Sequence, residues 1–476
     1  MILDRRESNT FTSALTLNGI PLCFVKELKY LGVILDSKCC WKQHILYLSK
    51  KYENILLGLN RVTRNTFGFK SNVTPLIYKQ GIVPFICYCS QIWGTALKKK
   101  INCRLLREMQ RRILLRVISG YRTISYEAVF AISAFPPIDI FIVHNRDFKI
   151  ATKTCIANNQ DVCLPVSKMP HPSEGSPINL VGYYQNIKDN FQVVCFTDGS
   201  KINSKVGLAF VVFQDHIETE VHQFRIRDEC SVFQVELLCI AQAVNWIRTN
   251  KNLSSNFLIC SDSLSSLYAL NCITSPNRLI VKTQTNLNFL QGRGVQVFFS
   301  FVRGHIGIYG NERADWLAKE ATKLIDFIPM IVPKSFYKSV FKKHVISQWN
   351  NLYQISHNVK STKEFFPSIH GRLKAIHFVL NFRITQFLTG HGNSKAYLKR
   401  FNLSRTDLCS CSSGEIQDVN HLILSCSKFT PARCLLISTP KKNNFAWPPS
   451  FSTLVQNKTC FASFCEFVDS TFPHII

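Results

Sequence analysis

The run FQVVCFTDGS, residues 191–200, is apolar until it reaches an acidic residue, a glycine and a serine. An apolar run of this length that ends in turn residues predicts a buried β-strand. Two further runs follow, VGLAFVVFQD at 206–215 and IETEVHQFRI at 217–226, and the polar residues between them predict a hairpin. The first run therefore predicts the opening strand of a β-sheet.

Helical and strand patterns alternate after this hairpin. Apolar residues at helical spacing predict a helix over 231–248, and NFLIC at 256–260 predicts a strand. A helical stretch, the strand VQVFFSFV at 295–302, a glycine-rich turn and a helix over about 311–323 complete the pattern. This order of elements predicts an α/β domain over residues 191–325.

The chain carries a large positive charge. Of its 476 residues, 57 are Lys or Arg and 30 are Asp or Glu, which gives a formal net charge of +27. This excess favours a polyanionic partner, nucleic acid or an anionic membrane surface, although a biased composition that only aids solubility also explains it. The apolar content of 46% indicates folded domains and excludes a disordered chain.

The cysteines and the N-terminus indicate an intracellular protein, in the nucleus or the cytoplasm. The 19 cysteines are odd in number and lack the spacing of a small disulfide-rich module, and residues 1–10 lack the apolar run of a signal peptide. The longest uncharged stretch, 80–97, is just shorter than a membrane span and contains a proline, which favours a buried helix. We expect no membrane partner, and the sequence excludes a secreted module, a multi-span membrane protein and a repeat solenoid.

Four carboxylates occupy notable places in the predicted domain. Asp198 and Asp262 end predicted strands, Asp315 begins the last helix, and Glu236 lies inside the first helix. Two have an ordinary explanation, since Asp315 could cap its helix and Glu236 could be a surface residue. The apolar neighbours of Glu236 instead favour a carboxylate that points into a cleft, at the edge where α/β sheets place their sites.

Carboxylates gathered in one cleft would bind divalent cations. Like charges raise one another's pKa, and Mg²⁺ or Mn²⁺, which prefer hard oxygen ligands, offset this repulsion. Two such ions roughly 4 Å apart would clamp a phosphodiester. His305 lies on a glycine-rich loop between Gly304 and Gly307, which suits proton transfer or product release, although a lone loop histidine is more often incidental.

Four segments in order, FTDGS, VELLCIAQA, CSDSLSSL and GHIGIYGNERADWLAKEA, together resemble ribonuclease H of type 1. The resemblance implies a mixed five-stranded sheet flanked by helices, and Mg²⁺-dependent hydrolysis of the RNA strand of an RNA–DNA hybrid that leaves a 3′-hydroxyl and a 5′-phosphate. The metal-binding positions of that family fall on four carboxylates: Asp198, Glu236, Asp262 and Asp315. His305 falls on the auxiliary histidine, and Ser200, Ser263 and Asn311 fall on flanking positions.

The chain departs from this family at two places. Related retroelement sequences commonly read Trp-x-Pro-Gly-His before the last helix, whereas Arg303 replaces the proline here, loosens the turn and adds a charge. Cellular enzymes often carry asparagines that sense 2′-hydroxyls shortly before the helix glutamate, whereas residues 231–234 are Ser-Val-Phe-Gln. We still expect an active enzyme, because all four carboxylates are present.

The rest of the chain resembles the C-terminal half of a non-LTR retrotransposon polyprotein. The segments that carry this resemblance include GIVPFICYCSQIWGTALKK, RRILLRVISGYRTISYEAVFAISAFPPIDI and FRITQFLTGHGNSKAYLKRF. It implies mostly helical flanks: a remnant of the reverse transcriptase region after the palm at 1–100, a basic helical connection and linker at 101–185, and a C-terminal region at 326–476. No Tyr-x-Asp-Asp or Phe-x-Asp-Asp motif occurs, so we expect no polymerase activity.

A basic stripe precedes the predicted domain. Four cations recur at spacings of four, three and four residues, on one face of a predicted helix: Lys100, Arg104, Arg107 and Arg111. Because acidic partners one turn away are scarce, the stripe favours contact with nucleic-acid phosphates, although a solvated helix face explains it equally well.

A Cys/His cluster lies at 409–426. Its residues, Cys409, Cys411, His421 and Cys426, suit a structural zinc site, with Cys434 as a substitute ligand. The Cys-x-Cys gap is tighter than usual, and chance clustering among many cysteines is the alternative. Lys399, Arg400 and Arg405 lie close by in the sequence, which favours a nucleic-acid contact beside the cluster.

The sequence leaves three hypotheses. The first is a retrotransposon-derived ribonuclease H that acts on RNA–DNA hybrids and binds RNA or DNA through its basic surface. The second is a catalytically silent nucleic-acid-binding relic, which predicts the same salt-sensitive binding without turnover. The third is a transposase-like or integrase-like nuclease with a related sheet. The sequence leaves open the oligomeric state and the sequence preference of the substrate.

Overall fold

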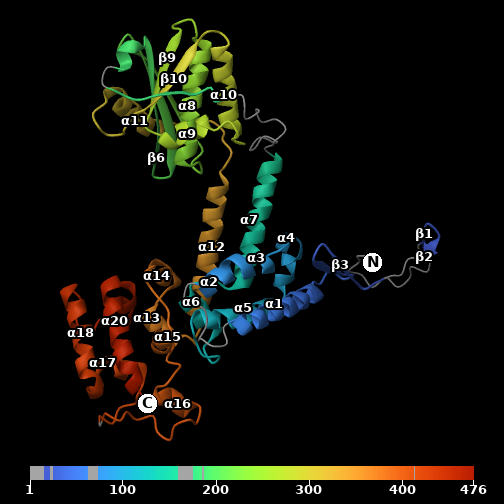
Figure 1. Ribbon diagram of the computed structural model, residues 1–476, viewed down its shortest axis with the longest axis vertical. Helices are drawn as coiled ribbons and strands as arrows, with labels where there is room; N and C mark the ends of the chain where they lie inside the picture. The colour runs from blue at the N-terminus through green and yellow to red at the C-terminus, as the bar shows by residue number, and fades with distance from the viewer. Residues whose placement is uncertain are drawn as a thin grey trace. The chain divides into compact units, whose positions relative to one another are not determined.

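The structure is a computed structural model that describes residues 16–21, 25–62, 73–158, 175–184, 187–411 and 413–475 (Figure 1). Its contacts divide the chain into two units, one made of Met1–Lys149 with Phe341–Ile476 and the other of Ile150–Val340. The second unit is thus inserted between the two parts of the first.

The elements fall in three groups along the chain. Up to residue 158 they are β1 (Thr16–Leu17), β2 (Ile20–Pro21), β3 (Glu27–Tyr30), β4 (Val33–Asp36), α1 (Lys42–Val62), α2 (Val73–Ile77), η1 (Tyr78–Ile82), α3 (Val83–Ile86), α4 (Ser90–Trp93), η2 (Gly94–Lys98), α5 (Lys100–Val117), α6 (Tyr126–Ser133) and α7 (Ile138–Asn158). From 179 to 321 they are β5 (Asn179–Val181), η5 (Ile187–Asn190), β6 (Val193–Ile202), β7 (Lys205–Gln214), β8 (Ile217–Ile226), α8 (Val232–Thr249), β9 (Asn256–Ser261), α9 (Leu264–Asn271), α10 (Arg278–Gln291), β10 (Gln296–Phe301) and α11 (Tyr309–Ala321). The last group is α12 (Lys334–Ile355), α13 (Lys360–Phe365), α14 (Ile369–Lys374), α15 (Phe382–Thr389), α16 (Lys395–Arg400), α17 (Val419–Leu424), η6 (Ser427–Phe429), α18 (Thr430–Lys442), α19 (Phe451–Gln456), α20 (Lys458–Thr471) and η7 (Phe472–His474).

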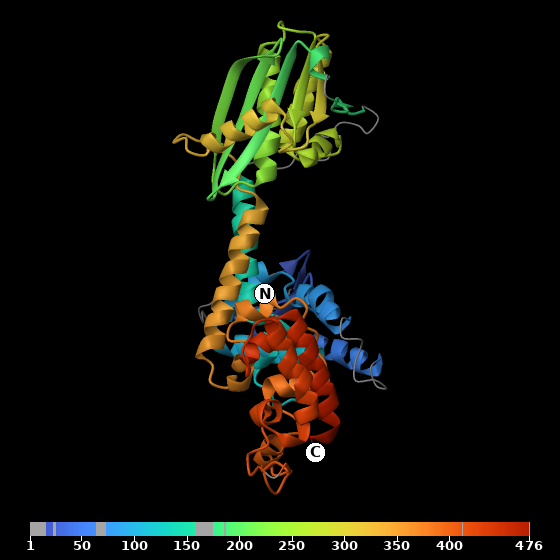
Figure 2. The same cartoon turned by 90° about the vertical axis from the view of Figure 1, so that its left-hand side faces the viewer.

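The inserted unit is a mixed sheet with helices on both faces (Figures 1 and 2). The strand order is β5-β10-β9-β6-β7-β8, in which β5, β10, β9 and β6 are parallel and β6, β7 and β8 are antiparallel. The predicted α/β class, the mixed sheet and its flanking helices are therefore confirmed. The sheet has six strands rather than five, because β5 pairs with β10. This three-residue strand lies in the segment predicted to be connection and linker, and it is too short to show an apolar pattern.

Side chains on the two faces of the sheet pack into two separate hydrophobic cores. Val193 and Cys195 of β6 pack in one cluster with α8 and α10, while Val194 and Phe196 pack in the other with α11. This alternation is what a strand covered on both faces requires. The tight turn predicted between the second and third strands forms at Asp215 and His216, which both adopt positive φ.

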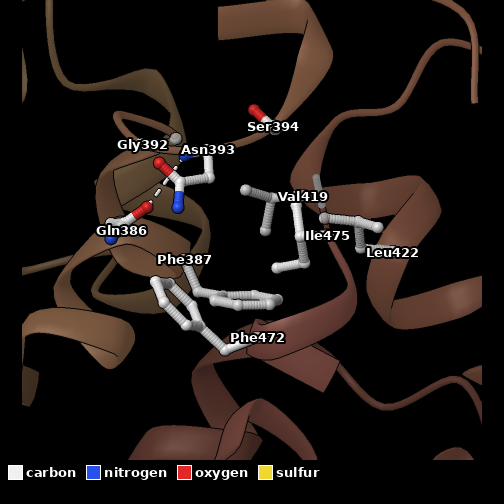
Figure 3. Close-up of a pocket in the computed structure, with 10 residues that line it drawn as sticks. Gln386, Phe387, Gly392, Asn393, Ser394, Val419, Leu422, Phe472 and Ile475 are labelled. Carbon is white, nitrogen blue, oxygen red and sulfur yellow. Dashed lines mark hydrogen bonds between the residues drawn. The ribbon is translucent and has the colours of Figure 1, made fainter.

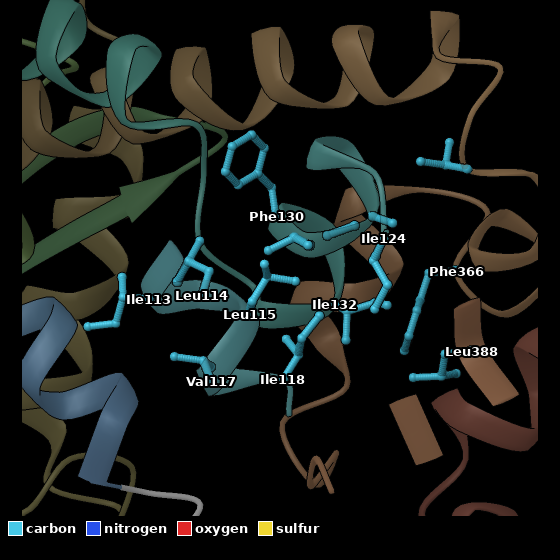
Figure 4. Packing of buried hydrophobic residues seen from close by; sticks show 14 of the residues in the cluster. Ile113, Leu114, Leu115, Val117, Ile118, Ile124, Phe130, Ile132, Phe366 and Leu388 are labelled. Atoms are coloured by element: carbon cyan, nitrogen blue, oxygen red, sulfur yellow. The ribbon is translucent and has the colours of Figure 1, made fainter. Parts of the chain in front are cut away.

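The first unit has one hydrophobic core built from both parts of the chain. The core joins residues of α5 and α6 with residues of α13, α15 and α20, and Figure 4 shows Ile118 and Ile132 together with Phe366 and Leu388. Buried Arg372 donates to the carbonyl of Ile132 at 2.9 and 3.1 Å, and Thr385 donates to the carbonyl of Ile118. Residues from each of the predicted segments 1–100, 101–185 and 326–476 contribute to this core, so these parts of the three segments pack together.

Most of the linker predicted at 165–177 lies outside the described residues, which resume at 175.

Within the described residues, no single helix is long and apolar enough to cross a membrane. One pair of helices, Tyr126–Ser133 and Ile138–Thr152, meets the length and composition of a span when taken together, but the two helices are bent by 60°.

Candidate metal-dependent nuclease site

The register of two parallel strands brings Asp198 and Asp262 together. Thr197 of β6 pairs with Ser261 of β9, so the next residue of each strand, Asp198 and Asp262, lies at the same level of the sheet. Contrary to the sequence prediction, β6 does not end at Asp198 but continues to Ile202, because it forms a long hairpin with β7. Asp198 is 5% exposed.

Helix α8 supplies the third carboxylate, Glu236. A capping box between Ser231 and Gln234 fixes the start of this helix. Gly199 lets the helix approach β6, since a Cβ there would lie 2.7 Å from Val235 and 3.0 Å from the backbone nitrogen of Glu236. Glu236 is 6% exposed, and its Oε2 has no hydrogen-bond partner. Oxygens of Asp198, Glu236 and Asp262 lie within 4.8 Å of one another.

The surroundings of these carboxylates disfavour their charged forms. Burial, with the charges of Asp262 and Asp315, raises the pKa of Asp198 to about 7. Burial, with the charges of Asp198 and Asp262, raises the pKa of Glu236 to about 9. The pKa of Asp262 is raised by burial and by Asp315, and the nearby His305 partly offsets that shift.

Asp315 stands apart from the cluster of three. Helix α11 begins at Tyr309 rather than near Asn311, so Asp315 lies in its second turn and is not an N-terminal cap. Its carboxylate accepts a 2.6 Å ion pair from Lys319, one turn further along the helix. Its charge still acts on Asp198 and Asp262, which places it beside the cluster.

The loop before α11 carries His305. This residue is exposed and has a φ of +56°, and Gly304 packs so closely on the site that a Cβ there would lie 3.0 Å from Oδ2 of Asp262. Among the flanking positions, Asn311 is 3% exposed and its Oδ1 has no partner, while Ser263 precedes α9. The sequence prediction missed the roles of Gly199, Gly304 and Lys319, whose signal was only adjacency to the carboxylates.

The residues present fit divalent cations. Three carboxylates within reach of one ion, all hard oxygen donors, match the preference of Mg²⁺ and Mn²⁺. A buried oxygen of Glu236 without a hydrogen-bond donor is costly unless a cation or a proton satisfies it. These residues, with Asp315 beside them, are therefore the ones that would hold metal ions.

We expect the stability of the magnesium-free protein to fall as pH rises from 5 to 9. The unfolded chain releases the protons of Asp198 and Glu236 near pH 4, whereas the folded chain holds them to about 7 and about 9. The folded state thus binds more protons in this window, and the free energy of unfolding decreases with pH, by at most about 1.4 kcal/mol per unit for each group. Urea unfolding at pH 5, 7 and 9 measures this slope, and a flat or rising profile would contradict it.

A groove of about 1100 Å³ lies beside the start of α8. Its lining includes Phe233, Arg278, Lys282 and Lys334, and none of the described residues that line it is acidic. The groove therefore offers positive charge to an anionic ligand.

The Cys/His cluster comes together in the first unit. One ligand atom from each of Cys409, Cys411, His421 and Cys426 lies within 4.8 Å of the others. The sulfurs of Cys409 and Cys426 are 3.7 Å apart, close to the roughly 3.8 Å edge of a tetrahedral zinc site with Zn–S bonds of about 2.3 Å. Cys411 Sγ lies 3.3 Å from Nε2 of His421.

Second-layer contacts orient these four residues. Nδ1 of His421 contacts the carboxylate of Glu415 and, at 3.0 Å, the hydroxyl of Ser425, the arrangement that directs Nε2 toward a metal. Arg433 donates to the carbonyl of Cys426 at 2.8 Å.

The helix that carries His421, α17, packs against residues near 475. Figure 3 shows Val419 and Leu422 of α17 beside Phe472 and Ile475. Cys434 is exposed and outside the cluster, so it is not a substitute ligand in this structure.

The predicted basic stripe on α5 does not face solvent as one surface. Arg107 makes two 2.8 Å hydrogen bonds to Asp139, which is 6% exposed. Arg111 donates to the carbonyls of Arg122 and Ile124 and lies over the ring of Tyr126. Lys100 and Arg104 are exposed. Two of the four cations therefore bind other parts of the fold, and contact of the stripe with phosphates stays a prediction.

Substitutions of Arg107 and Arg104 should separate these roles. Arg107→Ala leaves the buried Asp139 carboxylate unpaired and should lower the free energy of unfolding by about 2–3 kcal/mol. Arg104→Ala should change it by less than about 0.5 kcal/mol but weaken nucleic-acid binding and reduce the salt slope by about 1. Urea unfolding and salt-dependent binding measure the two effects, and equal loss of stability in both variants would contradict the assignment.

Residues 190–323, which contain strands β6 to β10 of the sheet and the carboxylate cluster, match the family model described as RNase H. The chain is also similar to retrotransposon polyproteins. It is 29% identical over 138 residues to a retrovirus-related Pol polyprotein from type-1 retrotransposable element R1 4 of Nasonia vitripennis, covering 29% of this chain and 34% of that protein. It is 34% identical over 119 residues to the RNA-directed DNA polymerase from mobile element jockey of Drosophila funebris, covering 23% and 12%. The chain thus spans about a third or less of these relatives.

The chain is also similar to solved structures. RNase H1 from the archaeon Halobacterium salinarum is 18% identical, with a TM-score of 0.21, over 27% of this chain and 96% of that one. LC11-RNase H1 in complex with RNA/DNA hybrid is 14% identical, with a TM-score of 0.23, over 27% and 96%.

Proposed function

We propose that this chain hydrolyses the RNA strand of RNA–DNA hybrids endonucleolytically, with two Mg²⁺ ions, as a retrotransposon-derived enzyme. The observation that carries the proposal is the cluster of buried Asp198 and Glu236 with half-buried Asp262, in the region that matches the RNase H family model. One oxygen of Glu236 in this cluster has no hydrogen-bond partner. When bound, the ions would activate a water and stabilise the leaving oxygen of the phosphodiester.

The chain's own residues have distinct tasks in this proposal. Asp198, Glu236 and Asp262 supply oxygen ligands from three separate elements, so the sheet and α8 set their spacing. Asp315 adds negative charge beside them, and Lys319 holds its carboxylate in place. His305, exposed on its loop beside Asp262, would exchange a proton with the reacting phosphodiester or the departing product.

Basic surfaces would hold the nucleic acid. In the inserted unit, Arg278, Lys282 and Lys334 would contact backbone phosphates along the groove. In the first unit, Lys100 and Arg104 remain available for RNA or DNA. We place the protein inside the cell, in the nucleus or the cytoplasm, where nucleic acid is present.

The Cys/His cluster would bind a structural zinc ion. The described cysteines form no disulfide, and the four ligand atoms lie within 4.8 Å of one another. The sulfurs of Cys409 and Cys426 are spaced as on the edge of a tetrahedral zinc site. With every position filled by protein, such a site is closed and stabilises the fold rather than catalyses.

Cleavage assays on matched substrates test the proposal. The same end-labelled RNA is offered alone, paired with RNA and paired with DNA, each with and without Mg²⁺. The proposal predicts cleavage of the hybrid only, with 3′-hydroxyl and 5′-phosphate ends. Salt-sensitive binding without cleavage under Mg²⁺ or Mn²⁺ would leave the silent relic, and strand transfer to DNA ends would favour the integrase-like nuclease.

A further inference from the structure

The segment after α11 makes a set of contacts that lie outside the matched ribonuclease H region. Residues 324–333, which we call the strap, follow the region 190–323 that matches the family model. Ile328 forms a parallel bridge with Ile226 at the end of β8, and its N–H donates to the carbonyl of Arg225 at 2.7 Å. The Arg225 guanidinium donates back to the carbonyl of Leu324 at 2.9 Å. The strap is therefore fixed to the edge of the sheet.

Apolar packing adds to this attachment. Ile328 and Met330 are partly buried against the core cluster that contains Val235, Leu237 and Leu238 of α8. The strap also lines the groove beside the start of α8, through the residues from Pro329 to Pro333. It thus contacts the same helix that carries Glu236.

Gln234 joins the strap to that helix. Its Oε1 accepts the backbone N–H of Ser231 at 3.1 Å, which closes the capping box, and its Nε2 donates to the carbonyl of Ile331 at 3.0 Å. One amide group therefore holds the first turn of α8 with its oxygen and the strap with its nitrogen. Glu236 lies two residues further along, within one helical turn.

We propose that the strap and Gln234 position Glu236 for metal binding, so that the working nuclease extends beyond the family region to residue 333. Gln234 is a positioning residue: it acts through the start of α8 and not on the substrate. The inference deepens the proposed function and rests on it for the identity of the metal site.

Substituting Gln234 separates its two bonds. In Gln234→Glu the carboxylate still accepts from Ser231, as in the usual capping box, but it cannot donate to Ile331. Ile328→Pro removes the N–H that the strap donates to Arg225 and leaves every charge unchanged. Ile325→Ala is the matched control, since Ile325 is 89% exposed within the same strap.

The experiment measures Mn²⁺ affinity of the full chain by calorimetry and hydrogen exchange of the amides 232–236. Gln234→Glu and Ile328→Pro should each weaken Mn²⁺ binding by about tenfold and speed exchange in the first turn of α8, with Ile325→Ala unchanged. Gln234→Glu adds a negative charge, which alone would tighten Mn²⁺ binding, so weaker binding identifies the lost bond. Unchanged affinity and exchange in both variants would overturn the inference.

Cleavage of the hybrid keeps the two proposals apart. If the wild-type chain binds Mn²⁺ but does not cleave the hybrid, the proposed function fails. The positioning role of the strap is then still tested by the Mn²⁺ affinity and the hydrogen exchange of the variants. If it cleaves, the variants should need about tenfold more Mg²⁺ for half-maximal rate. Lower thermal stability with an unchanged Mg²⁺ requirement would mean that the strap serves folding alone and would overturn its positioning role.

Discussion

Replacing Glu236 with Gln is expected to abolish cleavage and at the same time to stabilise the magnesium-free protein. Loss of a carboxylate ligand removes several kcal/mol of transition-state stabilisation, which corresponds to a rate loss of about 10³-fold or more. The stability effect has the opposite sign, because burial and Asp198 raise the pKa of Glu236 to about 9. At pH 8 the unfolded chain has released the proton of Glu236, whereas the folded chain must either keep this proton or bury a charged carboxylate. Either alternative lowers the free energy of unfolding, and Gln at this position avoids both.

Two measurements check both halves of this prediction. Urea unfolding at pH 8 without Mg²⁺ should give Glu236→Gln about 2 kcal/mol more stability than the wild type, and the gain should shrink toward pH 5. Glu320→Gln is the matched control, since the Glu320 carboxylate lies near the end of α11 and accepts from Lys323. A destabilised Glu236→Gln protein at pH 8 would show that this carboxylate serves the fold and not a metal.

Replacing Cys426, a proposed zinc ligand, is expected to destabilise the first unit as a whole. Cys426 is fully buried and belongs to the same core as Ile113, Phe130 and Phe366. Metal binding to such a cluster contributes folding free energy, so Cys426→Ser should lose zinc and about 4 kcal/mol, a fall in Tm of about 10 °C. Because the core is shared, amide protection should fall in α6 as well as in the C-terminal helices.

Cys434→Ser provides the control for this experiment. Cys434 is exposed, and within the described part of the chain its thiol makes one hydrogen bond, to the carbonyl of Thr430. This variant should keep its zinc and its Tm. Zinc content measured by mass spectrometry, with hydrogen exchange across α6, follows both variants. Full protection of α6 in zinc-free Cys426→Ser protein would refute the coupling between the cluster and the N-terminal helices.

The sequence predicts the central domain well because its strands and helices alternate in a strong apolar pattern. The apolar runs near 193–202, 205–214 and 256–261 are strands, and the order of elements matches the prediction. The strand β5 has only three residues, and two prolines interrupt the apolar run of the strap, so neither segment shows a periodic pattern. Only tertiary contacts reveal that they complete the sheet and the start of α8.

Long-range pairing explains what the sequence prediction missed. The spacing of Arg107 and Arg111 indicates one helix face, but the residues that they contact, Asp139 and Tyr126, lie beyond the end of that helix. In the same way, no local signal shows that residues near 118 and 385 share one core. Periodicity identifies a helix face, and it cannot identify what packs against that face.

The most direct test of the account is a time course of RNA-strand cleavage in an RNA–DNA hybrid, with wild-type chain and Asp198→Asn prepared side by side. Mg²⁺ is added or omitted, and hybrid binding is measured in the same samples. The account predicts Mg²⁺-dependent cleavage by the wild type and binding without cleavage by Asp198→Asn. Equal cleavage by both proteins, or binding without cleavage by the wild type, would contradict the assignment of this carboxylate site as a nuclease centre.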